Sequence, residues 1–595
     1  MPSKIVTKVN TDKLDELLSK FEHKLTPSQL ERGRKVSSNL KRGAPSCQKT
    51  SLPACQASNA DGAMKYGKEV TDTIAHWVKS GFAAGPFDSP PLSKFRVNSL
   101  AAVPQDGKVR PVINVSEPEG FSFNDNIDKN KLEKVKMTSA RNFGYSLKNC
   151  GKNAKLSKFD MKDAYKQVPC PLSDLRLQGF RWLNKYFCET SQMFGAKTAV
   201  PNYDTLGNTV EVIVHVQCDE SPGVVHRHLD DVPTVSPASS TFCEQFSEKY
   251  VTTCKDLNIE LAENCRAKDK AFCIETSGKV LGIWFDSTDL SWALPQDKKD
   301  KTLRAIFDAK NNDLISVLDM QKLLGNLNNV SMMCPFLNGF RRNLNEDLSF
   351  SLNCNTLLVR LSVQSKCDLN VWAGCLLDPG KNLPIPTCPN GPPLCHKTFT
   401  SDAAGCADSA DKSAGPGVAC IGISEDGEIS FASRHLWDKY MIEDMCDSDE
   451  KRFGNKTAFL EFVGIMIPFV MIPELLKNQH IVSRVDNISC IYAWENRSMK
   501  NDVYTSILIR ALHLISSYLC TIVHVEHLPR DTSWESQVVD RMSRELTCRS
   551  SDRAILGNFK HGKLPTFFVD WLRSPTCNWQ FANELLSYVV VLCEK

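Results

Sequence analysis

The order of apolar and polar positions predicts two helical regions near the start of the chain, with a polar stretch between them. Apolar residues recur with a weak helical period within the charged residues 1–35, and a clearer helical face follows over 68–80. Residues 36–62 are rich in Ser, Lys, Ala and Pro and poor in apolar side chains, which predicts a mobile linker or arm. A Pro-rich crossing, Gly85–Phe95, ends this N-terminal part.

Residues 96–116 read as two strands joined by a turn at Gln105-Asp106-Gly107, because Asp-Gly between apolar runs is a hairpin signal. The two-residue period of a strand puts Lys108 and Arg110 on one face of the second strand. Two cations on one face are usually only solvated, but this pair could also hold a triphosphate.

The pattern then predicts a strand that ends at Asp160, with this carboxylate on the face opposite Phe159 and Met161. A turn follows at Asp163 and leads into a helix that carries Tyr165. Further on, a short apolar run meets Asp230 and Asp231 before a turn rich in Pro and Ser. The other elements expected in this region are a loop and helix over 191–212, a helix over 240–257, and strands over 270–275 and 279–285.

Helical periodicity dominates residues 298–345, and 351–396 end in a linker rich in Pro, Gly and Cys. Strands and helices alternate afterwards in the order βββαβαβα, which predicts a mixed sheet flanked by helices. Four acids fall on these elements, mostly at strand ends: Asp402, Glu461, Asp486 and Asp540. The last residues, with their apolar run Leu585–Cys593, are expected to be a small packing appendix.

Length and composition are those of a globular protein with several domains. The chain has 595 residues, 42% of them hydrophobic and 24% charged, with a net charge of +3. A polyanion site must therefore be a local basic channel and not a global field. The 24 cysteines include no CxxC pair, and no secretory signal precedes them, so we expect reduced thiols and an intracellular protein that is neither secreted nor membrane-embedded. The most membrane-like run, Phe459–Leu476, contains acids and prolines and is expected to be a buried helix.

The adjacent Asp230 and Asp231 suggest a cation site. Two like charges at ~4 Å cost about 4 kcal/mol at an effective dielectric near 20, and a bound cation removes that cost. An exposed turn is the plain alternative for such a pair. With Asp160, these acids form one candidate constellation, and Asp402, Glu461, Asp486 and Asp540 form a second. Acids spread over strand ends can hold two Mg²⁺ ions ~3.5–4 Å apart for phosphodiester chemistry. Glu461 is the least ordinary of them, because it lies within an apolar run.

The motifs around these acids resemble the reverse transcriptase–RNase H segment of a retroelement polyprotein, over roughly residues 90–548. Five stretches carry the first part of the resemblance in the expected order: KVRPVINVSEPEGFSFNDNI, KFDMKDAY, MFGAK, HLDD and KVLGIWFD. Four more resemble the acidic motifs of RNase H: SDAAG, LEFVG, VDN and VDRMSR. The first and last of the nine are most similar to DIRS-type and gypsy-like LTR retrotransposons.

The resemblance implies an α+β multidomain fold: a right-hand polymerase with fingers, palm and thumb, followed by an RNase H-like α/β domain with a mixed sheet. The implied domains are an N-terminal helical and basic arm with a flexible linker (1–90), fingers and palm (91–297), thumb (298–350), connection (351–396), RNase H (397–548) and a C-terminal appendix (549–595).

The resemblance also implies roles for single residues. Asp160, Asp230 and Asp231 would hold two Mg²⁺ ions for DNA synthesis, with Mn²⁺ as an alternative. Tyr165 would be a steric gate that excludes the 2′-hydroxyl of a ribonucleotide. The remaining nucleotide-binding residues would be Lys108, Arg110, Phe194, Gly195 and Lys197. The second set, Asp402, Glu461, Asp486 and Asp540, would hold two metal ions that activate water against the RNA strand of a hybrid.

Two departures from the family pattern stand in this sequence. His228 replaces the usual aromatic residue before the paired aspartates, where we expect it to contact the primer end and not a metal. Phe194 stands where many relatives have Gln. The histidine often found before the last RNase H acid has no clear match, since His527 lies upstream.

The implied partners are an RNA template, a DNA or RNA primer, an RNA–DNA hybrid and deoxynucleoside triphosphates, in the cytoplasm with access to the nucleus. Tyr165 and the second domain argue against a rival reading, an RNA-dependent RNA polymerase. A domesticated or decayed copy that binds nucleic acid without catalysis is the second rival. Decay would strike catalytic acids as readily as other positions, and all seven are present.

Overall fold

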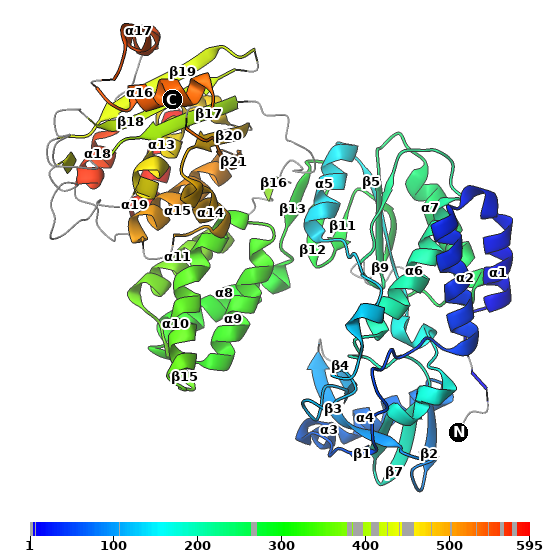
Figure 1. The fold of residues 1–595 in the computed structure, drawn as a ribbon. Helices are drawn as coiled ribbons and strands as arrows, with labels where there is room; N and C mark the ends of the chain where they lie inside the picture. The colour runs from blue at the N-terminus through cyan, green and yellow to red at the C-terminus, as the bar shows by residue number, and fades with distance from the viewer. Residues whose placement is uncertain are drawn as a thin grey trace. The chain divides into compact units, whose positions relative to one another are not determined.

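The chain forms a mixed α/β structure of two compact units, Met1–Ser291 and Trp292–Lys595, as seen in the computed structural model (Figure 1). The structure describes residues 4–594 apart from 6, 106–107, 263–270, 378–382, 385–396, 406–415, 425, 439–440, 443–456, 478, 500–501, 520, 531, 546, 560–563 and 574–579. Parts of three expected features therefore lie outside the described residues: the Asp106-Gly107 turn, the linker rich in Pro and Gly, and Trp579.

A four-stranded sheet in the first unit carries Asp160 and Asp231. Its strand order is β10 (Phe272–Glu275), β5 (Lys155–Asp160), β9 (Asp231–Ser236) and β8 (Val224–Val225). Strands β5 and β9 are antiparallel, and their register pairs Asp160 with Asp231. The strand predicted to end at Asp160 is confirmed.

Helices of the first unit share one core with this sheet. They are α1 (Thr11–Lys20), α2 (Pro27–Arg42), α6 (Ala199–His215) and α7 (Phe242–Asp256). The expectation of a linker over 36–62 is wrong for residues 36–42, which end α2. Helix α2 has a Thr26–Gln29 capping box and Pro27 in its first turn, and it buries Val36 and Leu40. A few well-placed apolar side chains were enough to hold this polar segment on the core.

The second sheet of the first unit contains the predicted hairpin. Its order is β1 (Cys55–Gln56), β3 (Arg96–Gln105), β6 (Gly179–Trp182), β7 (Lys185–Glu189) and β2 (Ala83–Phe87), and β4 (Lys108–Asn114) also pairs with β3. The β3–β4 pairing runs from Ser99 with Asn114 to Gln105 with Lys108. The predicted helix over 68–80 is confirmed as α4 (Gly67–Lys79).

The single strand expected over 279–285 is wrong. The residues form two antiparallel strands, β11 (Ser277–Val280) and β12 (Ile283–Asp286), which pair in register. Leu281 and Gly282 both have positive φ, at 48° and 78°, and make the tight turn between them. Two adjacent positive φ values are typical of a type I′ hairpin turn, here with glycine at its second position.

The second unit begins with helices, as expected for 298–345. They are α8 (Gln296–Asn311), α9 (Val317–Ser331), α10 (Arg342–Asn353) and α11 (Val363–Leu377). Strands β14 (Leu314–Ser316) and β15 (Leu358–Arg360) form a small antiparallel ribbon beside them. The predicted apolar face of α9 is buried through Met320, Leu324 and Leu327.

A mixed five-stranded sheet follows, as the alternation of elements predicts. Its order is β19 (Ile429–Leu436), β18 (Gly417–Ile423), β17 (Lys397–Ala403), β20 (His480–Val485) and β21 (Ile522–His527). Strands β19, β18 and β17 are antiparallel, while β17, β20 and β21 are parallel. The helices on this sheet are α13 (Thr457–Met471), α14 (Ile488–Asn496), α15 (Val503–Tyr518) and α16 (Trp534–Met542). Helix α14 was not predicted, so the order is βββαβααβα.

The most hydrophobic helix, α13, is buried in the second unit, as predicted for this run. In the described part of the chain, none of the helices has both the length and the apolar character needed to cross a membrane. The C-terminal residues form α17 (Ser550–Asn558), α18 (Thr566–Arg573) and α19 (Gln580–Glu594), and α19 packs on α15. Trp571 stacks on Phe581 with ring centroids 4.1 Å apart, so the expected packing appendix is helical and well packed.

Candidate functional site

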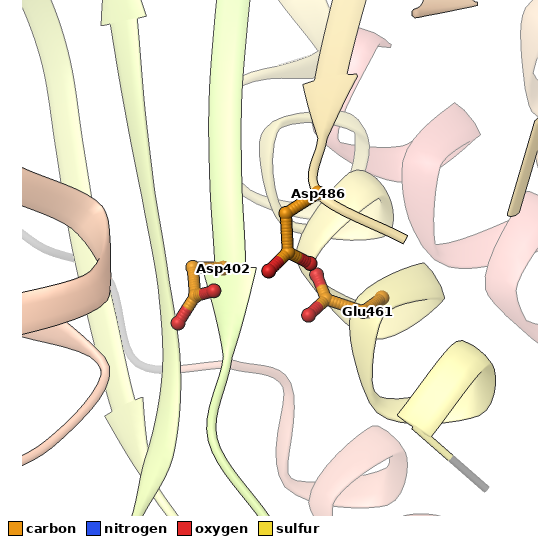
Figure 2. A group of neighbouring side chains, drawn as sticks. All are labelled: Asp402, Glu461 and Asp486. Carbon is orange, nitrogen blue, oxygen red and sulfur yellow. The ribbon is translucent and has the colours of Figure 1, made fainter. Parts of the chain in front are cut away.

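Three buried or half-buried acids meet at one end of the five-stranded sheet (Figure 2). Asp402 lies near the end of β17, Asp486 directly follows β20, and Glu461 comes from α13. Strands β17 and β20 are parallel neighbours, so their carboxyl ends bring Asp402 and Asp486 to the same edge. One oxygen from each of the three side chains lies within 4.8 Å of the others. The predicted meeting of these three acids is what the structure has.

Helix α13 can bring Glu461 this close because Gly464 lies one turn further along the same helix. A Cβ atom at Gly464 would lie only 2.9 Å from the side chain of Ser401 and 3.2 Å from Val418. Any larger residue would therefore push the helix away from β17 and β18. The glycine of the LEFVG motif thus sets the distance between Glu461 and the sheet.

Glu461 is only 3% exposed, and its two carboxylate oxygens differ. Oε1 accepts a hydrogen bond from the backbone N–H of Ala403 at 3.3 Å. Oε2 is buried and receives no hydrogen bond from the described residues. Burial raises the pKa of Glu461 well above its ordinary value, and the neighbouring charges of Asp402 and Asp486 raise it further.

Asp402 is 4% exposed and is oriented by a serine. Ser543 Oγ donates to Asp402 Oδ2 at 2.6 Å and also to the backbone oxygen of Asp540 at 2.9 Å. Burial raises the pKa of Asp402 and the Ser543 hydrogen bond opposes the shift, while the charges of Asp486 and Asp540 add to it. Ser543 was missed from the sequence, although its place three residues after Asp540 on one helix was a usable signal.

The fourth predicted acid, Asp540, lies on α16 at the rim of this group. Its Oδ1 accepts a hydrogen bond from Arg544 at 2.6 Å and lies 3.7 Å from Nε of Arg530. Arg530 also contacts two acids of the triad, and it too was missed from the sequence. His527, at the end of β21, is exposed and bonds through Nε2 to the backbone oxygen of Asp486 at 3.0 Å.

The donor set suits a hard divalent cation. Carboxylate oxygens are the ligands that Mg²⁺ and Mn²⁺ take, and Asp402, Glu461 and Asp486 bring them from three separate elements. The buried Glu461 Oε2, with no hydrogen-bond donor among the described residues, is an oxygen that a cation would satisfy. The residues present therefore fit a metal ion.

The acids of the first unit are arranged differently. Asp160 and Asp231 are cross-strand partners in register on β5 and β9. Asp230 lies in the tight turn between His228 and Asp231, whose backbones hydrogen-bond to each other at 2.9 and 3.1 Å. Leu229 has a φ of 58° there, and the backbone oxygen of Asp230 accepts from the N–H of Met161 at 3.0 Å. The turn is thereby tied to the strand of Asp160.

Asp231 forms an ion pair with a lysine. Lys158 Nζ lies 3.1 Å from Asp231 Oδ1, and the lysine side chain is buried. Lys158 precedes Asp160 by two residues on β5, so the strand period placed it on the same face and could have revealed it. In the described part of the chain, only the Asp402, Glu461 and Asp486 group brings three ligand atoms within 4.8 Å, so the Asp160 set is not drawn together to that degree.

Burial raises the pKa of Asp230, and the charge of Asp231 adds to this effect, while a backbone hydrogen bond, His228 and Lys158 oppose it. Tyr165 follows Asp160 on a short 3-10 helix, Ala164–Gln167. Burial raises the pKa of Tyr165 and so does the charge of Asp230, which places the phenol in the electrostatic field of this acid. The Tyr165 ring makes edge contacts with Phe194 at 5.7 Å and Tyr203 at 5.8 Å.

The loop with Gly195 and Lys197 is organised by an asparagine that the sequence reading missed. Asn124 donates to the backbone oxygen of Gly195 at 3.0 Å and accepts from the backbone N–H of Lys197 at 2.9 Å. Gly195 has a φ of 90°, a conformation that favours glycine. Lys197 Nζ donates to the backbone oxygen of Asn124 at 3.1 Å.

The predicted pair of cations is only partly described. Arg110 is exposed on β4, opposite Val103, while the side chain of Lys108 lies outside the described residues. His228 is half-buried, and its Nδ1 bonds to the backbone oxygen of Thr138 at 2.8 Å. Contact of these residues with nucleotide or primer stays a prediction.

No protein-family model and no curated protein matches this chain. Solved structures of similar shape include the foamy viral protease–reverse transcriptase dRH in complex with double-stranded DNA, at 13% identity and a TM-score of 0.44. That match covers 89% of this chain and 84% of the other. Two more are the foamy viral protease–reverse transcriptase with RNA/DNA hybrid (12% identity, TM-score 0.46, 90% and 65% covered) and with double-stranded DNA (12%, 0.41, 89% and 100%). Because these TM-scores lie below 0.5, the likeness does not by itself establish the fold or the function of this chain.

Proposed function

We propose that the chain is an RNA-directed DNA polymerase of a retrotransposon-like element of DIRS or gypsy type, with an RNase H domain that degrades the RNA strand of RNA–DNA hybrids. The observation that carries the proposal is the convergence of Asp402, Glu461 and Asp486, three acids far apart in the sequence that lie within 4.8 Å of one another. Burying like charges together is costly, and such groups are typical of sites that bind cations. The ordered motifs around both acidic sets supply the reaction class.

In the second unit, the proposed reaction is hydrolysis of the RNA strand. Mg²⁺ bound at the four acids would activate water and stabilise the leaving oxygen. The protein's part is to fix its oxygen ligands before the substrate arrives. Gly464 sets the approach of Glu461, Ser543 orients Asp402, and the parallel pairing of β17 with β20 places Asp486.

In the first unit, the proposed reaction is transfer of a deoxynucleotide to a primer. Asp160, Asp230 and Asp231 would hold two Mg²⁺ ions, which would activate the primer hydroxyl and bind the triphosphate. The cross-strand pairing of Asp160 with Asp231 supports this assignment. Lys158 holds Asp231 in the absence of metal, and its positive charge offsets the repulsion between the acids.

Tyr165 is proposed to select deoxynucleotides by blocking the 2′-hydroxyl. Its ring is held at its edges by Phe194 and Tyr203 and lies close enough to Asp230 for the pKa of the phenol to rise. Arg110 is exposed and able to reach a triphosphate, with Lys108 predicted to act beside it. Gly195 and Lys197 are proposed to approach the template–nucleotide pair on the loop that Asn124 braces.

The proposed substrate is a primer–template duplex held mainly through its backbone, so its affinity should fall as the salt concentration rises. In this proposal, residues 91–297 form fingers and palm, 298–350 the thumb and 397–548 the RNase H domain. The proposed place of action is the cytoplasm, with access to the nucleus.

A hybrid-cleavage assay tests the second half of the proposal. The full chain with Mg²⁺ is expected to cut the RNA strand of a labelled RNA–DNA hybrid and to leave single-stranded RNA intact. Asp486→Asn is expected to abolish cutting, since it removes a ligand charge at the centre of the triad. Cutting that persists in Asp486→Asn would come from another source and would overturn the site assignment.

A further inference from the structure

A single arginine lies across the acidic group of the second unit. Arg530 belongs to the loop between β21 and α16, and its Nη2 and Nε lie 2.8 and 3.1 Å from Asp486 Oδ2. Nη2 is also 3.8 Å from Asp402 Oδ1, and Nε is 3.7 Å from Asp540 Oδ1. One guanidinium therefore reaches three of the four acids, each of which comes from a different element.

The neighbouring arginine does not share this position. Arg544 bonds to Asp540 at 2.6 Å along the same helix, and no ion pair to Asp402 or Asp486 is described for it. Arg530 is thus the described cation that bridges the acids of the sheet to the acid of α16.

The same carboxylate oxygen cannot serve a guanidinium and a metal ion equally well. Asp486 Oδ2 accepts both hydrogen bonds from Arg530, which occupies the side of the oxygen facing the other acids. A divalent ion placed among Asp402, Glu461 and Asp486 would also repel the guanidinium at this short range. Metal binding and the Arg530 contact therefore compete.

Arg530 is free to leave when a metal ion enters. Its side chain is 51% exposed, whereas Asp402 and Glu461 are almost fully buried. The cost of breaking a half-exposed ion pair is small, because water and salt screen it. The arginine can hold the acids together without trapping them.

We propose that Arg530 is a positioning residue that acts as a tethered counter-cation: it neutralises the acidic site in the absence of metal and yields its place when a divalent ion binds. This inference rests on the proposed metal site. The site is then stable and preformed without metal, at the cost of a lower metal affinity.

Mn²⁺ binding to the full chain, followed by the loss of the free Mn²⁺ EPR signal, tests this competition. All proteins carry Asp230→Asn and Asp231→Asn, so that the first acidic set does not contribute. We expect Arg530→Gln to bind Mn²⁺ about fivefold more tightly than the parent, which is the upper range for a half-exposed ion pair. Arg530→Lys, which keeps the charge but loses the fork, should fall between them.

Arg484→Gln is the matched control, because Arg484 lies on β20 in the same sheet and pairs with Glu526. It should leave the Mn²⁺ affinity unchanged. An equal affinity in Arg530→Gln and the parent would overturn the role of Arg530 while leaving the metal site intact. If neither protein binds Mn²⁺, or if Asp402→Asn does not weaken binding, the proposed metal site fails and the inference falls with it.

Discussion

At the scale of single residues, Glu461 is the clearest case of function opposing stability. Its carboxylate is buried beside two other acids, and burial with these charges raises its pKa. The folded chain therefore holds the proton more tightly than the unfolded chain, so the stability that this group contributes at low pH is lost as the pH rises through the raised pKa.

We therefore predict that Glu461→Gln stabilises the metal-free protein by about 1–3 kcal/mol at pH 8, and by less at pH 5. Glutamine keeps the acceptor for the Ala403 N–H and removes the charge. Urea unfolding of the full chain at the two pH values measures the effect, with the exposed Glu474→Gln as a control that should change nothing. A destabilised Glu461→Gln at pH 8 would show that the carboxylate is already compensated in the folded protein. Hybrid cleavage should be lost in the same variant.

Tyr165 allows a second residue-scale prediction, on sugar selectivity. Removing the ring in Tyr165→Ala should let ribonucleotides be incorporated and reduce the preference for deoxynucleotides on the order of tenfold to a hundredfold. Tyr165→Phe keeps the ring and its contacts with Phe194 and Tyr203, so it should keep the preference. The ratio of kcat/KM for the two nucleotide types is the measurement, and an unchanged ratio in Tyr165→Ala would refute the gate.

At the scale of elements, one buried ion pair joins α11 to α15 within the second unit. Arg510 Nη1 donates to Asp368 Oδ1 at 2.7 Å, and both side chains are 1% exposed. Arg510 also donates to the backbone oxygen of Gly339, and its guanidinium lies 4.8 Å from the centre of the Phe340 ring. Burial raises the pKa of Asp368 to about 6 although Arg510 opposes the shift. The pair fastens the helices before the sheet to the helix that lies on it.

Breaking this pair on one side should cost about 3–5 kcal/mol, because it leaves a buried charge without its partner. We predict this loss for Arg510→Met, measured as the shift in urea unfolding of the second unit. The double variant Arg510→Met with Asp368→Leu should recover most of the loss, since neither charge then remains. A double variant as unstable as the single one would mean that packing, and not charge, holds these helices.

The elements around both acidic sets were predictable because strand ends and helix periods are written locally in the sequence. The period of two placed Asp160 at the end of β5, and the apolar run around Glu461 indicated a buried helix. The turn at Leu281-Gly282 was not foreseen, because an apolar run of strand-forming residues hides two adjacent positive φ values. Residues 36–42 were misread as a linker for the opposite reason, since only Val36 and Leu40 anchor them.

The second acidic set was predictable as a group of acids but not as a neutralised site. Strand order brings Asp402 and Asp486 together, and this follows from a parallel sheet. Arg530 reaches them from a loop of no regular period, so neither its direction nor its partners could be read from spacing. Such long-range contacts depend on the tertiary fold.

At the scale of the whole molecule, the two acidic sets lie in different compact units, and this separation has a consequence. Asp160, Asp230 and Asp231 belong to Met1–Ser291, and the other four acids belong to Trp292–Lys595. We predict that Asp486→Asn abolishes hybrid cleavage while primer extension stays within about twofold of the parent, since distant sites act independently. Asp230→Asn should do the reverse. Loss of both activities in either variant would contradict independent sites.

Primer extension on an RNA template tests the central claim most directly. The purified chain is given Mg²⁺, deoxynucleoside triphosphates and a labelled DNA primer annealed to RNA, beside Asp230→Asn and the exposed control Asp256→Asn at the end of α7. The account predicts extension by the parent and by Asp256→Asn, and none by Asp230→Asn. If the parent adds no nucleotide with either Mg²⁺ or Mn²⁺, the chain is a non-catalytic nucleic-acid-binding protein and the account is contradicted.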